Sequence, residues 1–215
     1  VQTCALPIFP KWIHANLSFV LGIDISKDNI QNQLDGACAR YLDYCKRFSI
    51  MPGALFVQGN SALNIKSGAG ISGEKYKQIV KAVFGDGPKD KALLGEGVYR
   101  EYGKAENGFN VSSCQFAIHY MFETRANVCN FLRNVCECTA VGGYFIGTTY
   151  DGATMFDALK PYEVGDGIAV LHKGKRVWQV TKAYTATEFL DDETSVGYAI
   201  DVYQESINKT FREYL

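Results

Sequence analysis

Four short apolar segments, each of which ends in a polar residue, constrain the fold of this chain more than any other feature. They comprise residues 19–24, 54–58, 109–115 and 144–148. Runs of this length and composition are typical of strands buried in a parallel sheet. The segments between them carry apolar residues at helical spacing. Alternating strands and helices predict an α/β fold, and the first strand–helix–strand unit is expected to be parallel with a right-handed connection.

The ends of the predicted helices follow from capping residues and glycines. Ser26 or Asp28 can cap the first helix, and Gly142-Gly143 is expected to end the third as a turn that leads into the last buried strand. Residues 85–108 are rich in glycine and charge, show no clear period and predict a long loop or insertion. The apolar stripes of the predicted helices cover residues 30–45, 76–84 and 122–136.

The pattern changes after Met155, where β signals replace helical ones. Residues 168–171 and 176–181 flank a short Lys-Gly-Lys turn and predict a β-hairpin, and residues 196–202 predict one more strand. Residues 206–213 form a short amphipathic segment with a surface-like composition. This part of the chain is therefore expected to be β-rich.

These patterns divide the chain into two parts of one partial domain. We expect an α/β core over residues 9–155 and a β-rich extension over residues 156–215 that covers the strand ends. Residues 1–8 are expected to be a non-native artefact, because the chain starts at Val rather than Met and these residues resemble a translated sequencing adapter. The native sequence is then expected to begin at about Phe9, in the middle of a domain.

Charge and cysteine content limit the class of protein. The formal net charge of the 215 residues is −1, so no global basic field indicates nucleic-acid binding, and an RNA contact has to come from a local patch or a partner domain. The seven cysteines form no recognisable disulfide framework, which favours a reducing, intracellular compartment. No apolar run approaches the roughly 20 residues of a membrane helix, and no signal peptide is visible.

Polar residues at the strand ends are candidates for ligand binding, because open α/β sheets bind ligands beyond the carboxyl ends of their strands. Asp24 can accept hydrogen bonds from both hydroxyls of a ribose, or it can serve only as a helix-capping carboxylate. Asn60 and Ser61 suit the edge of an adenine, or they only form a turn. Residues 68–73 match G-x-G-x-x-G, but several residues separate them from the preceding strand, which favours an insertion over a phosphate site.

Several other residues have an ordinary structural explanation on residue type alone. Phe116, at a strand end, can be a core residue, and His119 can be a hydrogen-bonded structural histidine. Cys129, Cys136 and Cys138 come closest to a metal-binding pattern, but C-x6-C-x-C on a helix and its end is not the spacing of zinc ligands. We therefore expect no metal site.

Four motifs follow one another along the chain and carry a family resemblance. They are Pro10-Lys-Trp12, Gly22-Ile-Asp-Ile25, Ser113-Cys-Gln-Phe-Ala-Ile-His-Tyr-Met-Phe-Glu123 and Gly142-Gly-Tyr-Phe-Ile-Gly-Thr-Thr149. In this order they resemble the motifs of mRNA cap guanine-N7 methyltransferases, in particular those of large DNA viruses, whose capping enzymes are often multidomain. The resemblance implies a partial class I, Rossmann-like S-adenosylmethionine-dependent methyltransferase domain over residues 9–215. The first strand and the glycine loop of that sheet are expected to be missing, because no such loop stands before Asp24.

The resemblance implies a binding site for the methyl donor, S-adenosylmethionine. Asp24 would hold the ribose of the donor, and Asn60 and Ser61 would lie at its adenine. The family usually has Asp where this chain has Asn60, and Asn can still donate or accept at an adenine edge. Gln115 would contact the donor from the fourth strand of the family's sheet.

The resemblance also implies a pocket for the cap guanine. Phe116, His119 and Tyr120 would line this pocket, and Glu213 matches the acid that recognises guanine. Tyr150 stands where many family members have proline. No residue is expected to act as a general base, because guanine N7 already carries a lone pair and no proton has to be removed.

The implied function is transfer of a methyl group from S-adenosylmethionine to N7 of the guanine of the 5′ mRNA cap. Lys11 and Arg40 resemble basic positions near the cap phosphates, so RNA with a GpppN end is the expected partner, and triphosphatase or guanylyltransferase domains can be fused or associated.

Two alternatives stay open: a class I methyltransferase acting on another base or small molecule, and a non-catalytic stimulatory or RNA-binding subunit of a capping enzyme. The chain as given is expected to be nearly inactive without a donor loop. Host cytoplasm or virion is the expected location for a viral protein, and the nucleus for a cellular one.

Overall fold

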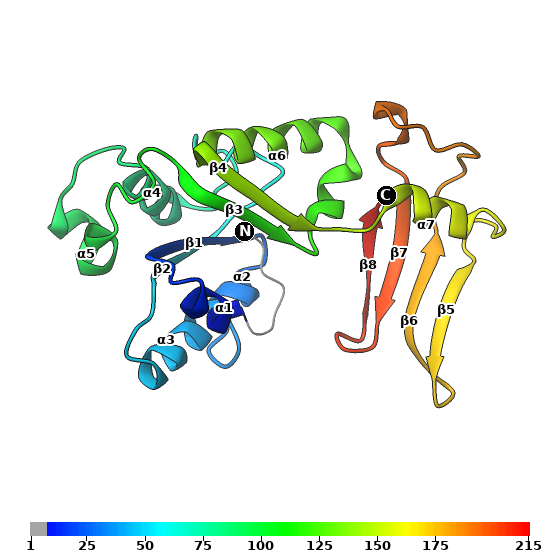
Figure 1. The fold of residues 1–215 in the computed structure, drawn as a ribbon, viewed down its shortest axis with the longest axis horizontal. Helices are drawn as coiled ribbons and strands as arrows, with labels where there is room; N and C mark the ends of the chain where they lie inside the picture. The colour runs from blue at the N-terminus through cyan, green and yellow to red at the C-terminus, as the bar shows by residue number, and fades with distance from the viewer. Residues whose placement is uncertain (1–7) are drawn as a thin grey trace. The chain divides into compact units, whose positions relative to one another are not determined.

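A computed structural model describes residues 8–215 of the chain as a mixed α/β protein (Figure 1). Its contacts divide into two units. The first comprises the residues up to Phe116 together with Asn130–Gly147, and the second comprises Ala117–Cys129 together with Thr148–Leu215.

The first unit contains two pairs of strands. β1 (Phe19–Asp24) and β2 (Gly53–Gln58) are parallel and in register from end to end, which confirms the predicted parallel strand–helix–strand unit. β3 (Phe109–Gln115) and β4 (Thr139–Thr148) are hydrogen-bonded to each other as a second pair. Because β1 and β2 run in the same direction, the residues that follow their last positions lie at one edge of the pair.

Apolar side chains of β1, β2 and α4 form the core of the first unit. Leu21, Ile23 and Val57 on the strands belong to one buried cluster with Val80 on α4. The helical stripe predicted over residues 76–84 is thereby confirmed. Burying one such side chain contributes about 1.5–3 kcal/mol to stability. The helices of this unit are α1 (Ile8–His14), α2 (Lys27–Gln31), α3 (Ala37–Arg47), α4 (Glu74–Val83), α5 (Lys91–Arg100) and the second half of α6 (Arg125–Cys138), which starts in the second unit.

The single helix predicted over residues 30–45 is wrong, because the chain interrupts it between α2 and α3. Oδ1 of Asn32 accepts hydrogen bonds from the backbone N of Leu34 (2.9 Å) and of Asp35 (3.3 Å), a local turn that competes with the helix. The turn also requires glycine at position 36, because a Cβ there would lie only 2.5 Å from the carbonyl O of Asn32. Leu34, which the pattern placed on the apolar stripe, is 91% exposed.

Of the two alternatives predicted for residues 85–108, the long loop is wrong, because the segment contains α5, while the insertion stays a prediction. The carboxylate of Asp90 caps this helix by accepting a hydrogen bond from the backbone N of Ala92 at 2.8 Å. Gly95 has a φ of +74° and interrupts the helical backbone. The apolar residues on its two sides therefore do not share one helical period.

Gly142 and Gly143 do not form the predicted turn. α6 ends at Cys138 and β4 begins at the next residue, so both glycines lie inside the strand. At Gly143 a Cβ would lie 2.8 Å from the carbonyl O of Asn110, so the absence of a side chain allows the neighbouring strand to approach. β4 is also largely exposed along its length, whereas the sequence predicts a buried strand.

The second unit is built on a four-stranded antiparallel sheet in the order β5-β6-β7-β8. The predicted hairpin and the β-rich character of this part are confirmed, while the expected boundary between residues 155 and 156 stays a prediction. Phe156 and Leu159 on α7 pack against Val180 and Ile200 of the sheet in one buried cluster. The elements are β5 (Gly167–His172), β6 (Lys175–Lys182), β7 (Ala199–Gln204), β8 (Lys209–Tyr214), α7 (Gly152–Leu159) and the 3-10 helices η1 (Ile118–Glu123) and η2 (Glu193–Ser195).

Three properties of the chain as a whole can be stated for its described part. Within residues 8–215, no helix has the length and apolar character needed to cross a membrane. The predicted non-native stretch, residues 1–8, lies outside the described residues except for Ile8, the first residue of α1. The described cysteines are free thiols: Cys38, Cys45, Cys114, Cys129, Cys136 and Cys138.

Leu159→Ala is expected to destabilise the protein, because the Leu159 side chain is 0% exposed in the core of the second unit. Truncating a buried leucine costs about 2–5 kcal/mol. Leu171→Ala, at a position that is 64% exposed on β5, is the matched control and should change stability by about 0.5 kcal/mol or less. Urea denaturation measures both free energies of unfolding, and equal losses would contradict this packing.

Candidate functional site

Asp24 is buried at the end of β1, where its carboxylate is oriented by the start of α2. Oδ1 accepts a hydrogen bond from the backbone N of Ser26 (2.8 Å), and Oδ2 accepts one from Nδ2 of Asn29 (3.1 Å). Ser26 caps α2, as predicted, by accepting from the backbone N of Asn29. Each carboxylate oxygen has a second lone pair. Asp24 can therefore still accept hydrogen bonds from the hydroxyls of a ligand.

Asn60 and Ser61 follow β2 and lie at the same edge of the strand pair as Asp24. Oδ1 of Asn60 accepts from the backbone N of Ala62 at 2.9 Å, so Asn60 does form a turn. Its backbone N donates to the carbonyl O of Gly70 at 2.7 Å. The structure thus brings Asp24, Asn60 and Ser61, the residues predicted for the ribose and adenine, to one edge of the strand pair. These hydrogen bonds also fix the backbone of the loop that carries Asn60 and Ser61.

The glycines of residues 68–73 serve the packing of this loop. A Cβ at Gly70 would lie 2.6 Å from the carbonyl O of Asn60. Gly68 and Gly73 have φ values of +83° and +86°, a region that side chains other than glycine rarely adopt. The G-x-G-x-x-G pattern is therefore explained by the return of the chain toward Asn60.

Gln115 and Phe116 lie at the end of β3. Nε2 of Gln115 donates to Oγ of Ser113 at 3.1 Å and to the carbonyl O of Ile146 on β4 at 3.5 Å. Phe116 is 68% exposed, so it is not a core residue, and its φ is +52°. A bulky residue at positive φ costs about 1–3 kcal/mol, and such strain concentrates at functional sites.

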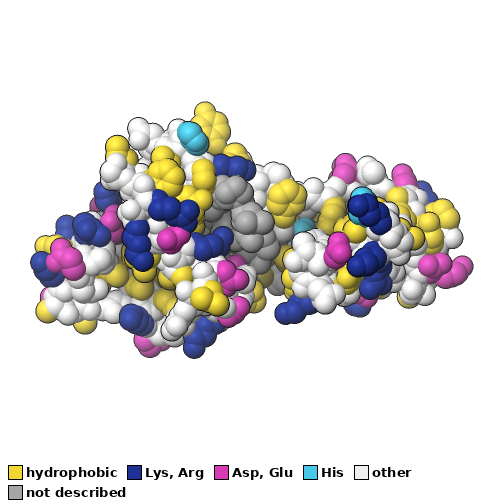
Figure 2. Space-filling model, turned by 90° about the horizontal axis from the view of Figure 1, so that it is seen from below, with side chains coloured by type: hydrophobic (Ala, Val, Ile, Leu, Met, Phe, Trp, Pro, Cys, Tyr) yellow, Lys and Arg dark blue, Asp and Glu magenta, His cyan; other side chains and the backbone are white. Residues whose placement is uncertain are grey.

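Lys11 and Arg40, the predicted phosphate contacts, lie on the neighbouring helices α1 and α3. Cζ of Arg40 lies 5.8 Å from the ring centroid of Phe9, which also contacts the ring of Tyr44 at 5.1 Å. Nε of Arg40 is buried without a hydrogen-bond partner, and Lys11 is exposed. Figure 2 shows Lys and Arg side chains interspersed with acidic and apolar ones on the face in view.

His119, Tyr120 and Glu213 come together in the second unit, around one carboxylate. η1 carries His119 and Tyr120, and β8, which contacts η1, carries Glu213. Nε2 of His119 lies 3.6 Å from Oε2 of Glu213, and the hydroxyl of Tyr120 donates to Oε1 at 3.3 Å. Tyr150 also donates a hydrogen bond to this carboxylate, and its ring centroid lies 5.2 Å from that of His119.

This cluster is buried and retains polar atoms without partners. Glu213 is 3% exposed and His119 is 5% exposed. Both ring nitrogens of His119 and Oε2 of Glu213 have no hydrogen-bond partner, because the 3.6 Å contact between them is too long. A buried polar atom without a partner costs about 1–3 kcal/mol. Such atoms mark the place where polar groups of a ligand gain most from binding.

Burial dominates the protonation equilibria of the cluster. It lowers the pKa of His119 to about 4, so the imidazole is neutral near pH 7. It raises the pKa of Glu213, and the hydrogen bonds from Tyr150 and Tyr120 act in the opposite direction. Burial and then the charge of Glu213 raise the pKa of Tyr150, which keeps that hydroxyl protonated as a donor.

The predicted surface-like character of residues 206–213 is confirmed for most of them, and Glu213 on β8 is the buried exception. Glu213 stands opposite Ile200, a fully buried core residue, so its side chain shares the core face of the sheet. Sequence reasoning also missed the role of Tyr150 as a hydrogen-bond donor to Glu213. The only signal for it was the departure from proline at this position.

A cavity of about 180 Å³ lies beside the cluster, and Tyr150 forms part of its wall. Phe189 and Tyr214 line it with aromatic rings, and Asp191 and Asp192 add carboxylates. The side chains of η1 that contact Glu213 are not part of this wall. In the described part of the chain, no three His, Cys, Asp or Glu side chains are placed to hold a metal ion together.

Comparison with known proteins places the chain in a family. The family model described as the mRNA (guanine-N(7))-methyltransferase domain matches residues 73–186, more than half of the chain. The chain belongs to this family. The matched region includes β3 and η1 but not Asp24, Asn60 or Glu213. The resemblance that the motifs indicate is thereby confirmed.

Similar proteins carry related names but are much longer than this chain. It is 26% identical over 212 residues to the probable mRNA-capping enzyme of Acanthamoeba polyphaga mimivirus, covering 95% of this chain and 16% of that protein. It is 43% identical over 51 residues to the mRNA cap guanine-N(7) methyltransferase of Drosophila melanogaster, covering 24% and 12% of the two chains. It is 38% identical over 63 residues to mRNA cap guanine-N(7) methyltransferase 1 of Oryza sativa subsp. japonica, covering 28% and 17%. The chain spans less than a fifth of each of these relatives.

The buried His119 is expected to make stability depend on pH. The pKa of His119 in the folded protein is about 4, below the ordinary value of 6.5. As the pH falls, the unfolded chain therefore binds a proton at a higher pH than the folded protein does. The stability that depends on a neutral His119 is fully present above about pH 6.5, and it is lost as the pH falls toward 4. The free energy of unfolding should therefore rise with pH more steeply in the wild type than in His119→Gln. Parallel curves between these pH values would contradict the assignment.

Proposed function

We propose that the protein transfers a methyl group from S-adenosylmethionine to N7 of the guanine of the 5′ mRNA cap. The observation that carries the proposal is the buried carboxylate of Glu213, held beside two side chains of the most specific motif, His119 and Tyr120. The family of the chain and the names of its relatives support the proposal.

Glu213 distinguishes guanine from adenine in this proposal. A guanine presents an N1–H and an exocyclic amine to a carboxylate, whereas N1 of adenine is an acceptor and would face Glu213 with like polarity. The tyrosine hydroxyls orient the carboxylate and leave Oε2 without a partner. The ring of Tyr120 is available to stack on the base, at about 1–3 kcal/mol. Entry of the base requires a shift of the side chains that cover Glu213, which is 3% exposed.

The reaction needs no general base. The lone pair of guanine N7 attacks the sulfonium methyl group directly, and no proton has to leave before the bond forms. His119 is neutral near pH 7 and lines the guanine site without acting on a proton. Holding donor and acceptor in line can lower the activation free energy by up to about 7–11 kcal/mol. Alignment of the two bound molecules is therefore the catalytic contribution of this chain.

The first unit supplies the donor site in this proposal, as a class I, Rossmann-like sheet. Asp24 accepts hydrogen bonds from the ribose hydroxyls of S-adenosylmethionine, Asn60 and Ser61 lie at its adenine, and Gln115 contacts it from β3. The parallel pairing of β1 and β2 supports this arrangement, because ligands bind at the carboxyl ends of parallel strands.

Capped RNA is the partner that follows from the proposal. Lys11 and Arg40 are offered to the cap phosphates, and the unpaired Nε of Arg40 supports its part in this role. Triphosphatase and guanylyltransferase domains, fused or associated, are further proposed partners, and the greater length and the name of the mimivirus capping-enzyme relative are consistent with them. The free thiols support a reducing compartment, in host cytoplasm or virion for a viral protein.

Glu213→Gln and Tyr120→Ala are expected to weaken binding of capped RNA while leaving donor binding within about twofold. Loss of charge-assisted hydrogen bonds costs about 1.5–3 kcal/mol, which corresponds to roughly tenfold or more in affinity. Asp24→Asn is the converse control and should weaken donor binding instead. Calorimetric titration of the protein at its full natural length with each ligand measures these effects. Equal loss of both affinities in Glu213→Gln would count against the assignment.

Substrate choice separates the proposal from its alternatives. The protein at its full natural length is expected to methylate RNA that ends in GpppA, and to leave ATP unmodified, because only the cap presents guanine. Mass spectrometry of the digested product should identify 7-methylguanosine. Methylation of a different base or of a free nucleotide would indicate another class I methyltransferase. Stimulation of a separate methyltransferase without donor binding would indicate a non-catalytic subunit.

A further inference from the structure

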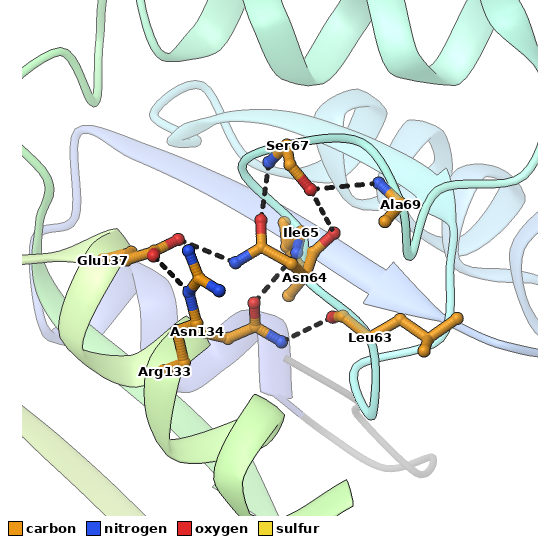
Figure 3. Close-up of polar contacts among 8 residues, drawn as sticks. All are labelled: Leu63, Asn64, Ile65, Ser67, Ala69, Arg133, Asn134 and Glu137. Atoms are coloured by element: carbon orange, nitrogen blue, oxygen red, sulfur yellow. Dashed lines mark hydrogen bonds and ion pairs between the residues drawn. The ribbon is translucent and has the colours of Figure 1, made fainter. Parts of the chain in front are cut away.

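The side chain of Asn134 binds the backbone of the loop that follows β2 (Figure 3). Its Nδ2 donates to the carbonyl O of Ser61 at 2.9 Å and to that of Leu63 at 2.7 Å. Its Oδ1 accepts from the backbone N of Ile65 at 2.9 Å. Asn134 lies on α6 and is 4% exposed, so the whole amide is used inside the protein.

A second contact joins the same loop to the same helix. Nδ2 of Asn64 donates to Oε2 of Glu137 at 2.7 Å, while Oε1 of Glu137 accepts from Nε of Arg133 at 2.5 Å. The Asn64 side chain also accepts from the backbone N of Ser67 at 2.7 Å. Successive turns of α6 thus hold residues 61–67 through a buried amide and a more exposed carboxylate (Figure 3).

The contacts within the loop fix Asn60 more firmly than they fix Ser61. Asn60 is held by the turn to Ala62 and by the carbonyl O of Gly70. The peptide carbonyl of Ser61 points to α6 and accepts from Asn134. The direction of the Ser61–Ala62 peptide therefore depends on a residue that lies more than seventy positions away in the sequence.

We infer that Asn134 is a positioning residue for the adenine end of the methyl donor, acting through the backbone of residues 61–65. The inference rests on the proposed function, in which Asn60 and Ser61 lie at the adenine. Asn134 does not touch the donor itself. It holds the loop in the geometry in which Asn60 and Ser61 face the ligand.

The residue type fits this role closely. An amide supplies two N–H donors and one oxygen acceptor, and the loop offers two carbonyl groups and one backbone N–H. Aspartate at this position would set a carboxylate oxygen against the carbonyl groups of Ser61 and Leu63. Alanine would leave the buried N–H of Ile65 and the partly buried carbonyl groups of Ser61 and Leu63 without this partner, which favours a rearranged loop.

The test compares Asn134→Ala with wild type in the protein at its full natural length. The KM for S-adenosylmethionine should rise about tenfold, as expected for the loss of roughly 1.4 kcal/mol of binding, while the KM for capped RNA and kcat stay within about twofold. Asn130→Ala, one turn earlier on α6, is the matched control and should leave all three constants unchanged. A parallel rise of both KM values, or a lower melting temperature with an unchanged donor KM, would overturn the inference.

A second perturbation keeps the inference testable where Asn134→Ala does not fold. Gly70→Ala pushes the loop from its other side, since the new Cβ would meet the carbonyl O of Asn60 at 2.6 Å, and it should raise the donor KM selectively. The backbone N–H of Ile65 donates a hydrogen bond to Oδ1 of Asn134. In the wild type, S-adenosylhomocysteine should slow hydrogen exchange at this N–H. Unchanged exchange at Ile65 on binding would overturn the inference. If the wild-type protein binds no donor, the proposed function is refuted. If the wild type and Asn134→Ala both bind the donor with the same affinity, only this inference is refuted.

Discussion

Burial of the Glu213 carboxylate is the constraint on which the second unit depends. Taking an ionised carboxylate out of water costs several kcal/mol unless hydrogen bonds or an opposite charge replace the lost hydration. The hydroxyls of Tyr120 and Tyr150 supply part of that replacement, but His119 is itself buried and neutral, so it brings no full positive charge. The carboxylate remains under-compensated. In the proposed function, the paired N–H groups of a guanine edge would therefore stabilise it more than they would stabilise an exposed, hydrated acid.

The donor side of the first unit is organised by a different device, the close packing of one loop. Gly70 allows the returning chain to approach Asn60, and the buried amide of Asn134 binds three backbone groups between Ser61 and Ile65. These contacts involve backbone atoms, so they fix the shape of the loop whatever side chains it presents.

The sequence predicts the strands better than the ends of the helices. β1 and β3 have the predicted bounds, because a short apolar run that closes on Asp24 or Gln115 has few other structures open to it. The break between α2 and α3 escapes prediction, since Asn32 competes for backbone hydrogen bonds inside an intact apolar period. Of the predicted guanine residues, the family motif identifies His119 and Tyr120, but no local pattern reveals that Glu213 is buried. Asn134 escapes for the same reason, because its partners are distant in sequence.

The same burial that makes Glu213 a strong acceptor also limits the pH range in which it can act. A protonated carboxyl would keep one acceptor oxygen and turn the other into a donor, so it could not accept from both the N1–H and the exocyclic amine of guanine. Because burial raises the pKa of Glu213, this loss of the acceptor begins at a higher pH than it would for an exposed glutamate. The hydrogen bonds from Tyr120 and Tyr150 stabilise the ionised form and oppose that rise. The two tyrosines therefore do more than orient the carboxylate: they favour the ionised form that the proposed guanine recognition needs, beside a neutral His119 that provides no compensating charge.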